Sequence, residues 1–203
     1  MKLDKSLVWT FLIMVGVAAL YRVIPNRPPG FAPQMALALF GGAVIRDKKW
    51  AFALPLFSLF ISDVIYQLLF VTGLTDIQGL YAYQVPIYLC FMAVTVFGFL
   101  LKKISFLNVT IFGTIGSVLF FLLSNFLVWV GGFGFARPKT FDGLMLCYSD
   151  ALLFYRDYGL IPGFTGNLLL GDLFFTGLVF GGFYLLKKFV LRQDPQVGLN
   201  HAR

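Results

Sequence analysis

Two kinds of side chain that enzymes rely on are scarce or missing in this chain. All nine acidic residues are aspartate, so glutamate is absent, and the only histidine is His201 in the C-terminal tail. Such a chain has no histidine-based acid–base catalysis and no histidine-rich metal site in its main body. We therefore expect no catalytic residues, no metal site and no cofactor, and the sequence predicts that the protein is not an enzyme.

Cysteine is also rare, with only Cys90 and Cys147 present. The two are far apart and lie in no CxxC motif, so the sequence indicates neither a zinc site nor a redox pair. Cys90 falls in an apolar run and is expected to serve packing, whereas Cys147 falls in a long connection and is expected to be exposed. A GxxxxGK[ST] motif is absent too, so the chain does not hydrolyse ATP by that chemistry.

Charged residues make up only 12% of the sequence, while hydrophobic residues make up 59%. Soluble domains have about 25% charged residues and 45–50% apolar ones. The mean hydropathy of +0.85 agrees with this bias. The sequence therefore predicts an all-α integral membrane protein with one transmembrane domain over residues 1–203. The net charge of +7 is not gathered into a basic patch with interleaved aromatic residues, so no nucleic-acid partner is expected.

Six apolar segments are predicted to be transmembrane helices. The second has 15 residues, fewer than the usual minimum of about 17, so it either spans a thin region or is shielded by its neighbours. The expected spans are residues 7–23, 31–45, 51–71, 85–101, 106–130 and 168–190.

Lysine and arginine are distributed unevenly between the two sides that these spans define. Eleven of the 16 lie at the termini and in the second and fourth connections. Cytoplasmic segments carry the excess of positive charge, so both termini are predicted to be cytoplasmic. The longest connection, Gly131 to Asn167, is then on the outer side, and its part from Phe141 to Tyr155 is expected to form a short interfacial helix or a re-entrant piece.

The third expected span carries an ionisable residue, Asp63, near its middle. A carboxylate at that depth costs roughly 2.5–3.5 kcal/mol on insertion scales, so it must have partners. Ser62, Tyr66 and Gln67 share its helix face. This polar stripe is predicted to face protein or water rather than lipid.

Most other polar residues of the expected spans fall in the outer half of the membrane. They either line a substrate pocket that opens to the outside or form a network, such as an ion pair of Arg22 with Asp63 or Asp172, that only ties helices together. Outer tyrosines could also contact a flat ligand. The candidate substrate-binding residues are Arg22, Asp63, Gln67, Asn125, Tyr148, Asn167 and Asp172.

Several ordered blocks resemble a family of small bacterial six-span membrane proteins that has no assigned activity. The blocks are FAPQMALALFGGAVI (31–45), ALPLFSLFISD (53–63), FFLLSNFLVW (120–129) and GDLFFTGLVFG (171–181). The chain also distantly resembles the substrate-binding S components of energy-coupling-factor vitamin transporters, including the stand-alone cobalamin-uptake type. This resemblance implies a bacterial cytoplasmic (inner) membrane location, a pocket facing outwards, and separate energising transmembrane and ATPase subunits.

Two functions are therefore expected from the sequence, whereas a third alternative, a membrane enzyme with Asp63 and Asp172 as a carboxylate pair or Cys147 as nucleophile, lacks a nearby histidine and further metal ligands. The first is a membrane uptake component that binds a small vitamin-like substrate from the outer side. The alternative is a structural or accessory subunit of a multi-protein cell-envelope complex, because pairs of small residues such as Gly177 and Gly181 permit close helix contacts with a partner.

Overall fold

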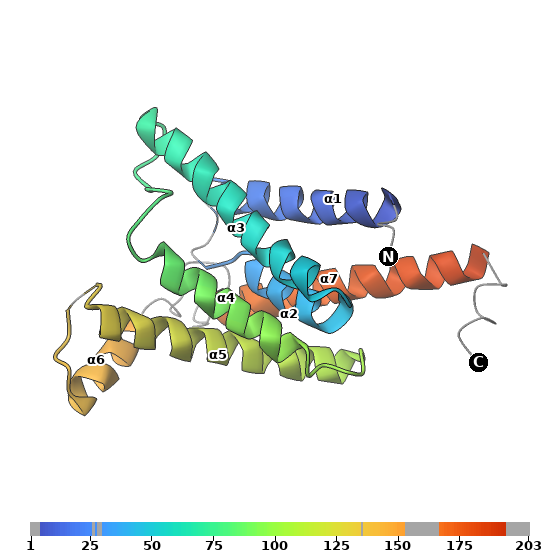
Figure 1. Ribbon diagram of the computed structural model, residues 1–203. Helices are drawn as coiled ribbons and strands as arrows, with labels where there is room; N and C mark the ends of the chain where they lie inside the picture. Colours follow the sequence, from blue (N-terminus) through green and yellow to red (C-terminus); the bar gives the residue numbers. More distant parts are fainter. Residues whose placement is uncertain (1–4, 26, 28–29, 135, 153–166, 194–203) are drawn as a thin grey trace.

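The computed structural model describes residues 5–25, 27, 30–134, 136–152 and 167–193. In this part of the chain there are seven helices and no strand (Figure 1). The helices are α1 (Lys5–Arg22), α2 (Gln34–Val44), α3 (Lys48–Val71), α4 (Gln84–Gly98), α5 (Phe106–Gly131), α6 (Phe141–Leu152) and α7 (Asn167–Gln193).

Three of these helices, α3, α5 and α7, are long and apolar enough to cross a membrane. The expected boundaries of spans three and five differ from the helices by only a few residues, and capping residues explain the starts that are seen. The Asp47 carboxylate accepts a bond from Lys49 N at 2.9 Å, so α3 begins before Ala51. Ser105 caps α5 in the same way, and Gly132, with φ of 70°, ends that helix.

The second expected span is wrong in its boundaries. Pro33 is the N-cap of α2 rather than part of its first turn, and the helix covers 11 residues instead of 15. At 1.5 Å per residue it is about 16 Å long, roughly half of the hydrocarbon thickness of a bilayer. Residues 34–42 are all buried, so neighbouring helices shield α2. This agrees with the second of the two sequence interpretations, shielding by neighbours.

The centre of the bundle is built around α2, which packs against α3, α4, α5 and α7. Two glycines allow this close packing. A methyl group at Gly41 would lie 2.5 Å from the Ala51 carbonyl oxygen, and one at Gly42 would overlap the carbonyl oxygen of Thr95. The apolar core continues through side chains such as Leu39, Leu54 and Val94, all of them fully buried.

Helices α1, α3 and α5 run in one direction, and α2, α4 and α7 run in the opposite direction (Figure 1). The starts of α1 and α5 and the end of α7 lie towards one end of the bundle, on the right in the view. The ends of α1, α3 and α5 lie towards the other end, where α6 packs beside α5. The helix predicted between the fifth and sixth spans is therefore confirmed as α6, over residues 141–152.

Candidate functional site

The polar stripe predicted on α3 faces protein. Ser62 and Asp63 are 0% and 1% exposed, and Tyr66 is buried on the same side of the helix. The Ser62 hydroxyl also donates to the Leu59 carbonyl, at 2.8 Å. The insertion cost of Asp63 is thus offset by neighbouring helices rather than by water.

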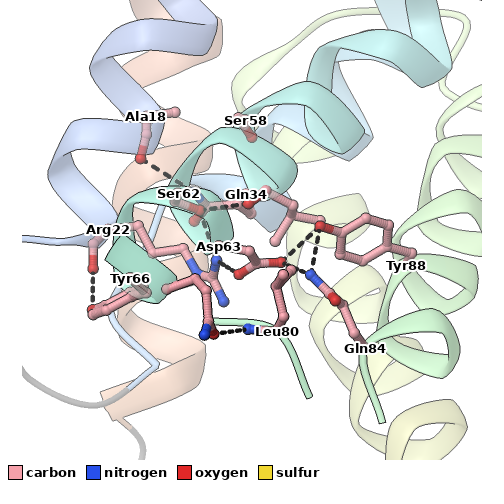
Figure 2. Close-up of polar contacts among 12 residues, drawn as sticks. Ala18, Arg22, Gln34, Ser58, Ser62, Asp63, Tyr66, Leu80, Gln84 and Tyr88 are labelled. Carbon is pink, nitrogen blue, oxygen red and sulfur yellow. Dashed lines mark hydrogen bonds and ion pairs between the residues drawn. The ribbon is translucent and has the colours of Figure 1, made fainter. Parts of the chain in front are cut away.

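Arg22, from the end of α1, forms an ion pair with Asp63 (Figure 2). Its Nη1 also donates to the Ser62 hydroxyl at 2.6 Å. The other carboxylate oxygen of Asp63 accepts from Gln84 Nε2 at 2.6 Å and from the Tyr88 hydroxyl at 2.7 Å, both on α4. Both oxygens are therefore used, and one carboxylate joins α1, α3 and α4.

A second layer of contacts holds Arg22 in place. Its guanidinium carbon lies 5.8 Å from the centre of the Tyr66 ring, within cation–π range. The Tyr66 hydroxyl and Arg27 Nε each donate to the Arg22 carbonyl, at 2.7 Å. These bonds satisfy a backbone acceptor that the end of α1 would otherwise leave open.

The connection from α3 to α4 closes over this ion pair. A methyl group at Gly79 would overlap the carbonyl oxygen of Asp63, so only glycine permits this approach. Gln67 Oε1 accepts from Leu80 N at 3.0 Å, which makes Gln67 an anchor for the connection. Burial and then the Asp63 carboxylate raise the pKa of Tyr81, while Arg22 opposes that rise.

Sequence reasoning missed Gln84 and Tyr88, which lie 21 and 25 residues after Asp63 on another helix. Their spacing of four residues was the available signal, because it places two polar side chains on one face of an otherwise apolar helix. The sequence alone did not indicate which helix this face meets.

Asn125 lies apart from the ion pair, in a cavity of about 210 Å³ between the ends of α4, α5, α6 and α7. The Tyr83 hydroxyl donates to the Ser124 carbonyl at its edge. Asn125 Nδ2 donates to the Phe121 carbonyl at 2.8 Å, which leaves its Oδ1 as an acceptor. The described residues that line the cavity are Tyr83, Ile87, Phe120, Phe121, Ser124, Asn125, Val128, Ala151 and Leu168.

The side chains of α6 close one flank of this cavity. The Tyr148 hydroxyl donates to the Leu122 carbonyl at 3.0 Å, and its ring lies 5.8 Å from that of Phe121. Cys147 Sγ contacts the Asn125 carbonyl at 3.6 Å and is 8% exposed. The expectation that Cys147 is exposed is therefore wrong, because α6 turns it towards α5. Burial raises the pKa of its thiol.

Asp172 lies in a third place, buried between α7 and α5. Ser117 on α5 is a polar neighbour of its carboxyl group, but the Ser117 hydroxyl has no hydrogen-bond partner among the described residues. The ion pair of Arg22 is thus with Asp63, one of the two partners considered.

The side chain of Asn167 lies outside the described residues.

The seven candidate residues therefore do not line one shared pocket. Arg22, Asp63 and Gln67 belong to the ion-pair cluster, Asn125 and Tyr148 to the cavity and its flank, and Asp172 to the contact of α5 with α7. In the described ranges, no three histidine, cysteine or aspartate side chains come together as a metal site.

Comparison with known proteins gives a family but no activity. No curated protein and no solved structure matches the chain, so the resemblance to S components of vitamin transporters has no support from these comparisons. One family model, described as a family of unknown function (DUF6580), matches residues 2–196. Because that match covers nearly the whole sequence, the chain belongs to the DUF6580 family.

Proposed function

We propose that this protein crosses the bacterial cytoplasmic membrane six times, with both termini in the cytoplasm. The alternating directions of α1, α2, α3, α4, α5 and α7 support this topology (Figure 1). So does the charge distribution: Arg46, Lys102 and Lys103 lie in the connections, and Lys48 and Lys49 in the first turn of α3, at the end of the bundle where α7 finishes. In this arrangement α2 is the short second span, shielded from lipid by its neighbours.

The protein acts, in this proposal, as an uptake component that binds a small vitamin-like substrate from the outer side. The observation that carries the proposal is the cavity beside Asn125, at the end of the bundle opposite the lysine-rich connections. Ligand sites are typically concave and mostly apolar, with a few placed polar groups. Phe120 and Phe121 give this cavity aromatic walls, and Asn125 Oδ1 offers a hydrogen-bond acceptor.

The cavity size limits the ligand. Drug-sized ligands occupy pockets of about 300–1,000 Å³, whereas this cavity measures about 210 Å³. A single heteroaromatic ring with small polar substituents fits that volume, and its face can pack on a phenylalanine. A molecule as large as cobalamin does not fit. Arg22 and Asp63 are not assigned to the substrate in this proposal. They form an ion pair with each other, and Asp63 also accepts hydrogen bonds from Gln84 and Tyr88 on α4.

An uptake component of this kind relies on other proteins for energy, since the sequence has no GxxxxGK[ST] motif. The partners proposed are a transmembrane subunit and an ATPase subunit, together with the surrounding lipid bilayer and the small-molecule substrate.

Native mass spectrometry of the purified protein tests the proposal. We expect a fraction of the wild-type protein to carry a co-purified small molecule. The Asn125→Leu variant, which keeps the side-chain size but removes the acceptor, is expected to lose it. Asn108→Leu is the matched control, because Asn108 lies at the other end of α5 and bonds the Lys103 carbonyl. A molecule retained equally by both variants would place its site elsewhere.

The alternative function, a structural or accessory subunit of an envelope complex, has one observation in its favour. Positions 177, 181 and 182 of α7 are glycines, and a methyl group added to any of them would meet no atom within 4 Å. This open space leaves room for a partner helix. Affinity purification separates the two proposals. Recovery of a stoichiometric envelope protein, without an ATPase subunit and without bound ligand, would favour the structural role.

A further inference from the structure

A larger cavity, of about 390 Å³, lies at the opposite end of the bundle from Asn125. It is formed where α2 ends, α3 begins and α4 ends. Its described lining includes three cationic side chains and no acidic one. The residues are Gly42, Ala43, Val44, Ile45, Arg46, Lys48, Phe99, Leu101 and Lys102.

The three cations have no strong partner of their own. No ion pair joins Arg46 or Lys102 to another residue in the described ranges. Lys48 Nζ lies 5.6 Å from the centre of the Phe99 ring, which keeps it beside the cavity. The nearest carboxylate in sequence, that of Asp47, accepts from Lys49 N and serves as the cap of α3. The cavity is thus a concentrated positive region with its charge available to an anion.

The other half of the lining is apolar, and this distinguishes between possible anions. Val44, Ile45 and Phe99 are partly exposed and would contact hydrocarbon rather than solvent. A free phosphate ion has no apolar part that could contact these side chains, whereas a phospholipid has both a phosphate and acyl chains. Basic pockets between transmembrane helices on the cytoplasmic side suit the headgroups of anionic lipids.

The helix ends alone would not select an anion here. The first turn of α3 carries partial positive charge, but the last turns of α2 and α4 carry partial negative charge next to it. These two contributions oppose each other, so the side chains of Arg46, Lys48 and Lys102 decide the sign of the site.

We propose that this cavity binds the phosphate of an anionic phospholipid from the cytoplasmic leaflet, with its apolar wall against the acyl chains. The inference uses the proposed topology but does not depend on the ligand site beside Asn125.

Native mass spectrometry with two lipids of identical dioleoyl chains, phosphatidylglycerol and phosphatidylcholine, tests this assignment. Wild-type protein is expected to bind phosphatidylglycerol more tightly. The Lys48→Gln/Lys102→Gln variant should weaken that binding by roughly ten- to thirtyfold and leave phosphatidylcholine unchanged, since each cation that lines the cavity is expected to contribute a few-fold to the affinity for the lipid phosphate held there.

The matched control is Lys49→Gln/Lys103→Gln, which removes the same charge from the adjacent positions that do not line the cavity. We expect it to weaken phosphatidylglycerol binding by less than about threefold, because it leaves the cavity cations in place. Equal losses in both variants would mean diffuse surface attraction and would overturn the site. Inorganic phosphate that binds wild-type protein as tightly as phosphatidylglycerol, or no preference between the two lipids, would also overturn it.

Discussion

The Asp63 carboxylate accepts hydrogen bonds from Arg22, Gln84 and Tyr88 while it is almost completely buried. Its insertion cost of roughly 2.5–3.5 kcal/mol is comparable to the gain from one or two hydrogen bonds to a charged group, at about 1.5–3 kcal/mol each. The cluster therefore stabilises the packing of α1, α3 and α4 only as long as it is complete.

Removal of one partner should be worse than removal of both. Asp63→Leu leaves Arg22, which is 18% exposed, without its counter-charge, and we expect a loss of about 3 kcal/mol in the free energy of unfolding, the lower end of the range for fully buried pairs. The Arg22→Met/Asp63→Leu variant should recover most of that loss, because a buried ion pair is often replaced by apolar residues at little cost. Thermal unfolding in detergent, followed by intrinsic fluorescence, measures both.

The control for this comparison is Asp76→Leu, which removes an exposed carboxylate from the connection after α3 and should change stability little. A double variant as unstable as Asp63→Leu would show that Gln84 and Tyr88, rather than Arg22, provide the main support for the carboxylate.

Single residues were predictable from the sequence where they carried charge. An isolated carboxylate in an apolar run demands a partner, so the pair of Arg22 with Asp63 was among the alternatives. The neutral partners Gln84 and Tyr88 were not found, because a buried amide or phenol imposes a smaller cost and has many acceptable positions. Cys147 was misplaced, since the direction in which α6 turns depends on tertiary packing.

At the scale of elements, α6 is fixed to the connection that precedes it by a bidentate ion pair. Arg137 Nε and Nη2 donate to Asp150 at 2.7 and 2.9 Å. Trp129 Nε1 donates to the Pro138 carbonyl at 2.8 Å, at the start of the same segment. Together, these two contacts connect the end of α5 with α6, the helix that flanks the proposed ligand cavity.

The bond from Arg137 lowers the pKa of Asp150 from its ordinary value of 3.8. A carboxyl group with a lowered pKa in the folded state contributes stability above its unfolded value, and this contribution disappears as the pH falls through the folded value. We therefore expect the environment of Trp129 to change only below about pH 4. Fluorescence in a Trp9→Phe/Trp50→Phe background measures this change.

The Asp150→Asn variant should show the altered Trp129 emission already at neutral pH. An acid transition of unchanged position in that variant would assign the titration to another carboxyl group.

Elements were predictable to different degrees for physical reasons. The long apolar runs predicted α3 and α5 to within a few residues of their observed bounds, because length and hydropathy decide such helices. The bounds of α2 were missed, since glycines and small residues let its neighbours cover it and relax the need for a full membrane-spanning length.

At the scale of the whole molecule, the six-span topology makes a prediction that reporter fusions can test. Fusions after Lys49 and Lys103 should report a cytoplasmic location, and fusions after Thr75 and Lys139 an external one. The physical reason is that the cationic connections gather at one end of the bundle. Reversed readings at two of these sites would contradict the proposed orientation and would place the Asn125 cavity on the cytoplasmic side.

The central claim is that the cavity beside Asn125 binds a small ring compound. The most direct test of this claim is whether such a compound stabilises the folded protein. Wild-type protein, Asn125→Leu and Asn108→Leu are heated with pyridoxine, nicotinamide, riboflavin or cobalamin. We predict that a single-ring compound stabilises wild type and Asn108→Leu, by about 2.7 kcal/mol at one hundred times its Kd, and does not stabilise Asn125→Leu. Folded wild-type protein that none of the four stabilises, or an equal response in Asn125→Leu, would contradict the account.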